Sequence, residues 1–472
     1  MKNKLIYGLA FLMVFGMSSC EKLSDFGDTN VNPAATTEPS ASALLTNSLA
    51  GLGNWTTSRQ LGYYAQYFSE TQYPSTSLYA LPQAAFSGNY SGTLYDLQNI
   101  INISPSKNQV AVSNIVKQFI FWQMTDRWGD IPYSQSLKGI EFGKPKYDTQ
   151  EDIYKGMIKA LTDAVASFDG SPISGDIVYN GNVDSWKRMA NSLRMLMSIQ
   201  LSKKFPAASG YAATEFKAAL AANGGYISTN DHNFKLKYAA PNYKSPIWGW
   251  YNGRADDAES KTMTDMLSSL TDARINVYGG DSHTGGSGTS TVGVPYGLNE
   301  SKSRAFVNAN AGWARILRGD FRTEGSTVFL ITAAQIALAR AEAANLGWTT
   351  ESAADTYKDG ITLSFTQWGL AAPSAAYFNA PDVALGTDNV KKIATQQWIA
   401  SYPDGHMGWN VWRKTGFPVL TPAPDAVNSS KQIVRRFTYA AAEYTNNPEL
   451  VKEAVDRLPG GDKQDSKVWW DQ

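Results

Sequence analysis

Residue types that perform catalytic chemistry are few and widely separated in this chain. The histidines are His232, His283 and His406, and none has the spacing of a His-Glu-x-x-His metal site. The only cysteine, Cys20, follows an N-terminal apolar run, and the Gly-x-Ser-x-Gly motif of serine hydrolases is absent. The sequence therefore predicts no nucleophilic or metal-dependent catalysis, and no cofactor.

Carboxylate pairs are the remaining route to catalysis, because two acids can hydrolyse a glycosidic bond. Asp256 and Asp257 are adjacent candidates. Other acids lie in or near the same part of the chain: Glu300, Glu324 and Glu342. Each of these can equally be a solvated side chain or a helix cap, and we expect that role. The sequence thus favours a binding protein over an enzyme.

Aromatic side chains are more informative, since a flat ring beside polar groups can cover one face of a ligand and hydrogen-bond its edges. The densest cluster lies in a loop bounded by proline and glycine: Trp248, Trp250, Tyr251, Asn252 and Arg254. An alternative role for the two tryptophans is to fill the core. A second cluster occupies the stretch 73–90, where prolines exclude a long helix. Its members are Tyr73, Tyr79, Asn89 and Tyr90.

These clusters must be positioned by helices, and the clearest helical signal runs from Ser326 to Leu420. A first helix is rich in small side chains, and Gly347 is placed to end it. Its alanines are Ala333, Ala334, Ala337, Ala341 and Ala344. A second helix carries an apolar stripe at spacings of three and four: Ala354, Tyr357, Ile361, Phe365 and Trp368. The pair resembles a tetratricopeptide unit, which must stack on others to bury its apolar face.

Further helices are predicted over most of the chain. The segments are 41–72, the stretch from Thr93, 109–127, 151–168, 185–205 and 216–220. Between 226 and 325 the helical signal weakens, and the glycine-rich stretch 279–297 is expected to be a flexible or hairpin-like insertion. Tryptophans within the helical stripes are expected in the core: Trp122, Trp186, Trp368, Trp398, Trp409 and Trp412. Trp469 and Trp470 are expected to fix the C-terminus.

The N-terminus predicts export and a lipid anchor. Lys2 and Lys4 precede an apolar run that ends before Cys20, which is typical of a signal peptide over 1–19. A lone cysteine at the cleavage point is similar to the lipoprotein box of bacteria, in which the thiol is acylated. Residues 20–40 are then a lipidated flexible tether, and 41–472 a single body. The alternative is an ordinary secretory signal with an incidental cysteine.

The amino-acid composition limits the classes of molecule that this protein is expected to bind. Lysine plus arginine and aspartate plus glutamate both total 42, so a nucleic-acid partner is not expected. No segment after the signal peptide approaches the ~20 apolar residues that a membrane span needs. The chain contains 14 Trp, 24 Tyr and 19 Phe, an excess that fits a stacking surface or a large helical core.

Several segments, taken in order, resemble the SusD/RagB family, in its branch with a tryptophan-rich C-terminus. They are WGDIPYSQSL, VGVPYG, AEAANLGW, KIATQQWIASYPDG, NVWRKTGFPVL and GGDKQDSKVWWDQ. The resemblance implies an all-α fold, with tetratricopeptide-like helix pairs in a right-handed superhelix and an irregular, loop-rich region that binds the ligand. It also implies a lipoprotein at the outside of the outer membrane, which serves as a lid on a SusC-like TonB-dependent barrel.

The ligand implied by this resemblance is an oligosaccharide, with a peptide as an alternative. Sugar rings expose a C–H face that an aromatic ring can cover, and hydroxyls that Asn, Asp and Arg can bind. The two aromatic clusters named above are therefore the predicted glycan-binding residues. A surface adhesion or scaffold lipoprotein remains a third possibility. The family can bind calcium, but no dense Asp/Asn loop indicates a site here.

Overall fold

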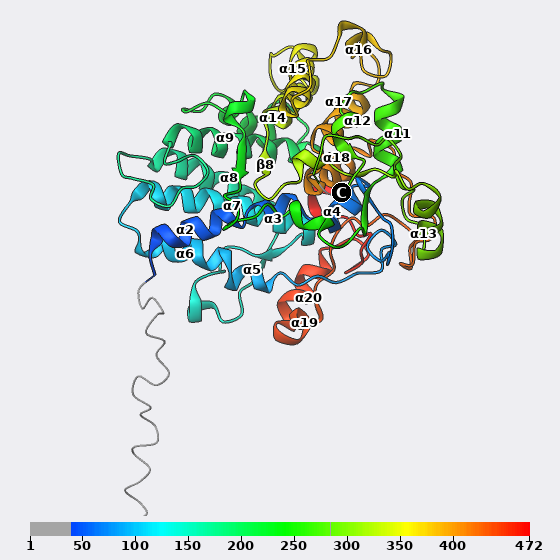
Figure 1. The fold of residues 1–472 in the computed structure, drawn as a ribbon. Coiled ribbons are helices and arrows are strands. Elements are labelled where there is room, and N and C mark those ends of the chain that lie inside the picture. The colour runs from blue at the N-terminus through cyan, green and yellow to red at the C-terminus, as the bar shows by residue number, and fades with distance from the viewer. Residues whose placement is uncertain (1–38, 284) are drawn as a thin grey trace, which may run out of the picture. The chain divides into compact units, whose positions relative to one another are not determined.

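The computed structural model describes residues 39–283 and 285–472. The predicted signal peptide, Cys20 and all but the last two residues of the tether lie outside the described residues. Within the described part, Ala41–Gln472 forms one compact unit. This unit is built mainly of helices, with short two-stranded sheets and no large sheet among the described residues, so the predicted all-α class is confirmed (Figure 1).

The helices form a succession of packed neighbours. The longer ones are α2 (Ala41–Ala50), α6 (Thr93–Ile103), α7 (Lys107–Trp128), α8 (Gln150–Ser167), α9 (Val183–Gln200), α10 (Tyr211–Leu220), α11 (Lys261–Ser269), α13 (Glu300–Ala309), α14 (Ala333–Asn345), α15 (Ala353–Gln367), α17 (Asn389–Ala400), α18 (Gly405–Thr415) and α20 (Pro448–Asp456). Shorter ones are α3 (Gly53–Thr56), α4 (Arg59–Tyr64), α5 (Ser87–Ser91), α12 (Ile275–Tyr278), α16 (Ala375–Asn379) and α19 (Ala441–Asn446). Helices α6 and α7, α7 and α8, α9 and α10, α14 and α15, and α17 and α18 pack on each other.

The pair α14–α15 has the structure that its sequence predicts. A capping box of Thr332 and Gln335 begins α14, and Gly347, in the left-handed region at φ 71°, follows its end. The two helices approach so closely that a Cβ added at Gly360 of α15 would lie 2.6 Å from Cγ of Leu338 in α14. The packing distance between the two helices therefore requires a glycine at position 360.

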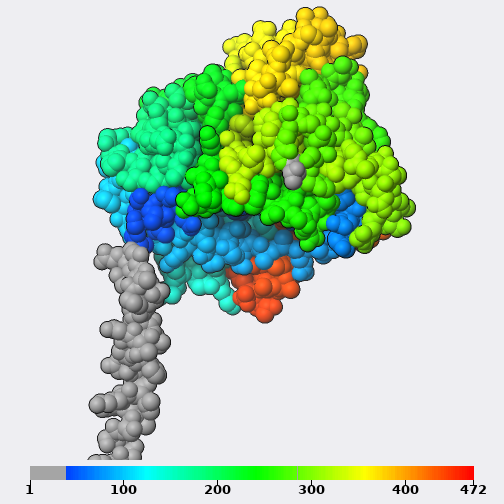
Figure 2. Space-filling view, in the orientation of Figure 1, coloured from blue at the N-terminus to red at the C-terminus, as the bar shows by residue number. Residues whose placement is uncertain are grey.

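The strands are short and join segments that are distant in the sequence. All pairs are antiparallel: β1 (Phe68–Glu70) with β5 (Asp257–Glu259), β2 (Ile131–Pro132) with β3 (Tyr147–Asp148), β4 (Phe234–Lys237) with β8 (Thr327–Ile331), and β6 (Gly279–Gly280) with β7 (Arg315–Ile316). Three of these pairs involve residues of the irregular region 226–325. In Figure 2 this region, coloured green to yellow-green, covers a continuous part of the visible face.

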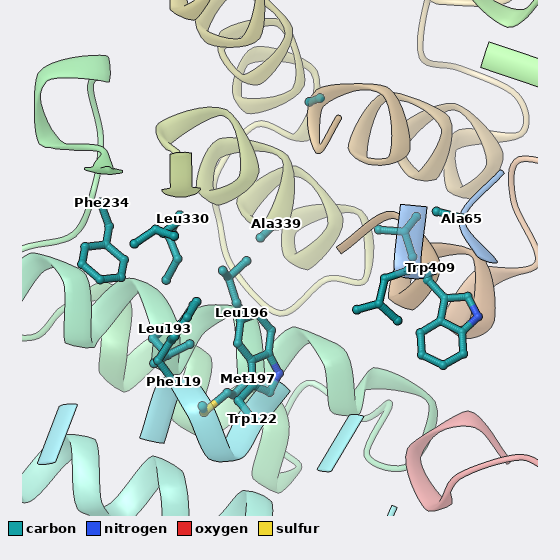
Figure 3. Close-up of a cluster of buried hydrophobic side chains, with 14 of the residues drawn as sticks. Ala65, Phe119, Trp122, Leu193, Leu196, Met197, Phe234, Leu330, Ala339 and Trp409 are labelled. Atoms are coloured by element: carbon teal, nitrogen blue, oxygen red, sulfur yellow. The ribbon is translucent and has the colours of Figure 1, made fainter. Parts of the chain in front are cut away.

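The core contains large aromatic side chains at the helix contacts. Phe119 and Trp122 of α7 lie against Leu193, Leu196 and Met197 of α9 in one part of it (Figure 3). The tryptophans predicted for the core are all at most 8% exposed: Trp122, Trp186, Trp368, Trp398, Trp409 and Trp412. That prediction is confirmed.

A buried polar centre links the C-terminus to the helices. The carboxylate of Asp126 in α7 accepts hydrogen bonds from Nε1 of Trp470 (2.9 Å), the hydroxyl of Tyr154 (2.5 Å) and Nδ2 of Asn410 (2.5 Å), and its Oδ2 lies 2.8 Å from Nε2 of His406. All of these side chains are buried. The last turn of the chain is thus fixed between α8 and α18, as the sequence predicts for Trp470.

Candidate functional site

The pairing of β1 with β5 brings the two predicted aromatic stretches together. In its register Phe68 faces Glu259 and Glu70 faces Asp257. Just beyond the strands, the amide of Thr71 donates to the carbonyl of Asp256 (2.8 Å), and Nε2 of Gln72 donates to the Asp256 carboxylate. Local sequence cannot encode this contact, because the two strands are separated by most of the first half of the chain.

We call the surface at this strand end the β1–β5 rim. It consists of Gln72, Tyr73, Asn252, Arg254, Asp256 and Arg304. Arg254, whose side chain is 65% exposed, pairs with Asp256, and Asn252 is also exposed. Exposed guanidinium and amide groups therefore lie along this edge, and the partly buried Asp256 carboxylate lies beside the guanidinium.

Tyr73 provides the aromatic surface of the rim. It is 59% exposed, the largest exposure among the aromatic residues that the structure describes. The Cζ atom of Arg304 in α13 lies 5.2 Å from the centre of its ring, which is a cation–π contact. The backbone of Tyr73 has a φ of 52°, a conformation that is costly for a bulky residue. Such outliers persist where the surrounding structure enforces them, and they gather at ligand sites.

Glu70 enforces this conformation. Its carboxylate accepts hydrogen bonds from the amides of Ser75 (2.9 Å), Thr76 (3.3 Å) and Ser77 (2.9 Å), and from the Ser77 hydroxyl (2.6 Å). Burial raises the pKa of Glu70, and these hydrogen bonds oppose that rise. The loop after β1 is therefore folded around one buried carboxylate, which holds Tyr73 outward.

Asp256 and Asp257 do not form a catalytic pair. Consecutive residues of a strand point to opposite faces. Asp257 points inward, where its carboxylate binds Nη1 of Arg59 (2.8 Å) and accepts from the hydroxyl of Tyr63. Burial raises the pKa of Asp257, and Arg59 lowers it. The other candidate acids form ion pairs: Glu300 with Arg304, Glu324 with Lys244, and Glu342 with Lys414.

Three of the predicted binding residues are buried, which corrects the expectation that their rings face a ligand. Trp250 is 4% exposed and packs edge-on against Phe68, at 5.5 Å between ring centres. Tyr251 is 7% exposed, with Arg322 over its ring, and its hydroxyl donates to the carbonyl of Asp257 and accepts from the amide of Ile316. Tyr79 is 1% exposed and binds the amide of Ala423. These rings support the loops from beneath.

The remaining predicted residues lie outside the rim. Trp248 is half-buried, and the ammonium of Lys244 lies 4.4 Å from the centre of its ring. Asn89 and Tyr90 belong to the short helix α5 and its surroundings, where the Tyr90 hydroxyl donates to the carbonyl of Pro132. The prediction thus combined residues from separate surfaces.

Sequence reasoning missed Gln72 and Arg304. Arg304 follows Glu300 by one helical turn, and this pattern alone is typical of a solvated helix face. Only its position over the Tyr73 ring in the folded protein identifies Arg304 as a candidate site residue. In the part of the chain that the structure describes, no group of three or more His, Cys, Asp or Glu side chains is arranged to hold a metal ion.

The rim is suited to binding a ligand with both apolar and hydroxyl-rich surfaces. The exposed ring of Tyr73 can cover a C–H face, while Arg254, Asp256 and Asn252 can bind hydroxyls. No nucleophile with an adjacent base lies among the rim residues.

Comparisons with known proteins agree with this architecture. A SusD-like family model, described as starch-binding and associating with the outer membrane, matches residues 33–440. A solved chitin-binding SusD homologue from Flavobacterium johnsoniae is 26% identical, with a TM-score of 0.78 over 92% of this chain and 98% of that chain. A SusD homologue from Bacteroides uniformis is also 26% identical, with a TM-score of 0.78 over 92% of this chain and 100% of that chain. Among curated proteins none matches.

Proposed function

The chain belongs to the SusD-like family of proteins that associate with the outer membrane, and on this premise we propose that it captures oligosaccharides at the cell surface. Proteins of this family are binding proteins and not enzymes. The family description names starch, and similar solved structures are described as chitin-binding, so a glycan is the ligand class that we propose.

The main observation in support of the proposal is that the Tyr73 ring is exposed at the surface. An exposed phenol ring in a costly backbone conformation, fixed by a buried carboxylate, has no role in the core. Its neighbours Arg254 and Asp256 supply the hydrogen-bonding groups that sugar hydroxyls require. We therefore place the glycan on the β1–β5 rim.

The further steps of the proposal concern anchoring and delivery. We propose that Cys20 is acylated and holds the body at the outer membrane, and that the protein passes its ligand to a SusC-like TonB-dependent barrel. None of the helices in the described part of the chain has the length and apolar character to cross a membrane. Substitution of Cys20 by Ala should release the protein from the membrane fraction, and the barrel should co-purify with the wild-type protein.

A ligand panel tests the function itself. Maltoheptaose, chitohexaose and a set of soluble peptides would each be added to the full chain while its melting temperature is measured. A ligand that binds only the folded state at a concentration 100-fold above its Kd adds about 2.7 kcal/mol of stability, which raises the melting temperature. A rise with an oligosaccharide supports the proposal. A rise with peptides alone would replace it with peptide capture, and no rise with any member of the panel would argue for a scaffold role.

A further inference from the structure

A pocket lies away from the β1–β5 rim, and we call it the α5–α19 pocket. Its volume is about 300 Å³, and it is lined by α5, α19 and the 133–147 loop, which leads from β2 into the first residue of β3. The aromatic side chains that line it are Phe86, Tyr90, Phe142 and Tyr147. None of the rim residues belongs to its lining, and Figure 1 shows α5 and α19 on a different side of the body from α13.

Hydrogen bonds between distant segments hold the pocket open. The amide of Lys146 donates to Oε1 of Gln135 (2.9 Å), which closes the 133–147 loop on itself. Nδ2 of Asn447 donates to the carbonyl of Pro145 (3.1 Å), and the Tyr147 hydroxyl donates to Glu443. The pocket is therefore preformed, and a ligand would not have to order its walls.

Polar groups at the pocket are available to a ligand. Among the described residues, the side chains of Ser87, Lys144 and Asn446 line the pocket and form no hydrogen bond with another residue. The ammonium of Lys138 lies 5.3 Å from the centre of the Phe142 ring. The pocket therefore combines aromatic surfaces with hydroxyl, amide and ammonium groups at its edge.

We propose that the α5–α19 pocket is a second saccharide-binding site, separate from the β1–β5 rim. The partly exposed rings of Tyr90 and Phe142 can cover the C–H face of one sugar, above the buried rings of Phe86 and Tyr147. Ser87, Asn446 and Glu443 can bind the hydroxyls of that sugar. A volume of about 300 Å³ is at the lower end of small-molecule sites and suits a terminal sugar unit better than a long chain. The inference rests on the proposed function, because it takes the same class of ligand.

The test uses the full chain with Tyr73→Ala, so that binding at the rim is weakened. Hydrogen exchange would be followed with and without maltoheptaose or chitohexaose. We expect sugar-dependent protection of amides in 135–147 and 443–447 to remain in this variant. Adding Phe142→Ala, or Asn446→Ala, should weaken that binding at least tenfold. The matched control is Ile140→Ala, since Ile140 lies in the same loop, is fully exposed and does not line the pocket.

The outcomes separate the two proposals. Sugar-dependent protection confined to 71–79 and 252–257 in the wild-type chain would overturn the pocket and leave the proposed function intact. Protection of the pocket that is unaffected by both Phe142→Ala and Asn446→Ala would also overturn it. Failure of both sugars to protect any segment of the wild-type chain would overturn both proposals together.

Discussion

The guanidinium of Arg304 lies over the ring of Tyr73, with its Cζ atom 5.2 Å from the ring centre, on the outer edge of the irregular region. The two side chains come from segments that meet only in the folded protein. Their contact covers one part of the ring and leaves Tyr73 59% exposed. An aromatic ring in this position is available to a ligand and is held in place before the ligand arrives.

Replacing Tyr73 by Ala should weaken oligosaccharide binding about tenfold, which corresponds to about 1.4 kcal/mol. The reason is the loss of the only strongly exposed ring on the rim. The melting temperature should hardly change, because exposed side chains contribute little to stability. Calorimetric titration would measure the affinity. The control is Tyr95→Ala, a tyrosine of α6 that is 53% exposed and does not belong to the rim. Equal effects of the two substitutions would contradict the assignment.

Glu70→Gln should loosen the loop that presents Tyr73. The amide side chain retains one acceptor oxygen, so part of the hydrogen bonding to Ser75, Thr76 and Ser77 is lost. We expect faster hydrogen exchange at these three amides and weaker sugar binding, while exchange in α14 and α15 stays unchanged. Unaltered exchange at Ser75–Ser77 would show that the loop does not depend on Glu70.

The free energy of unfolding should fall as the pH rises towards 8, because Asp404 is buried and its pKa is raised. Burial raises the pKa of this carboxyl to about 8, against backbone hydrogen bonds from His406 and Met407 that lower it. Between about pH 4 and pH 8 the folded chain keeps a proton on Asp404 that the unfolded chain releases. This contribution to stability is therefore complete below about pH 4 and is lost as the pH rises towards about 8.

Asp404→Asn removes this titration and keeps a good helix N-cap for α18. The free energy of unfolding of the variant, relative to wild type, should therefore increase with pH, by up to about 1.4 kcal/mol per unit. Urea unfolding at pH 5, 6, 7 and 8 would measure it. Asp382→Asn, at an exposed aspartate, serves as the comparison. A constant difference between Asp404→Asn and wild type across this range would contradict the prediction.

Gly405→Ala should destabilise the contact between α18 and α4. A Cβ at this position would lie 2.2 Å from the amide nitrogen of Gly62 and 2.3 Å from the carbonyl carbon of Leu61, so backbone would have to move. We expect a loss of about 3 kcal/mol or more in unfolding free energy. Gly88→Ala in α5 is the control, since no atom lies within 4 Å of its added Cβ and alanine favours the helix. Equal stability of the two variants would refute the tight contact.

Trp470→Ala should cost about 3–5 kcal/mol, the range for truncation of a buried tryptophan. Trp470 is fully buried and donates to Asp126, whereas the preceding Trp469 is only half-buried beside Lys204. Trp469→Ala should therefore have a much smaller effect. Chemical unfolding of both variants measures the difference, and comparable losses would mean that the end of the chain is not fixed through Trp470.

Periodicity predicted the helical framework well and the site only in part. The apolar stripe of α15 and the alanines of α14 indicate which helix faces are buried, because the geometry of a helix places residues three and four apart on one face. The rim depends on the pairing of β1 with β5, which brings Gln72 to Asp256 across the fold. Trp250 and Tyr251 were predicted as ligand contacts because loop tryptophans and tyrosines look alike whether they face solvent or the core. Their burial follows from contacts with Phe68 and Ile316, which no local pattern contains.

The long-range contacts beneath the rim also affect when the rim can form during synthesis of the chain. Tyr63 and Asp257 are 194 residues apart in the chain and meet through a hydrogen bond. Long-range pairings of this kind form late, after much of the chain is available. A nascent chain emerging from the ribosome with its N-terminus first would carry the segment of Tyr73 for a long interval before the segment of Arg254 has been translated. Ligand recognition at the rim thus requires segments from both halves of the chain, and a proteolytic fragment from either half would lack it.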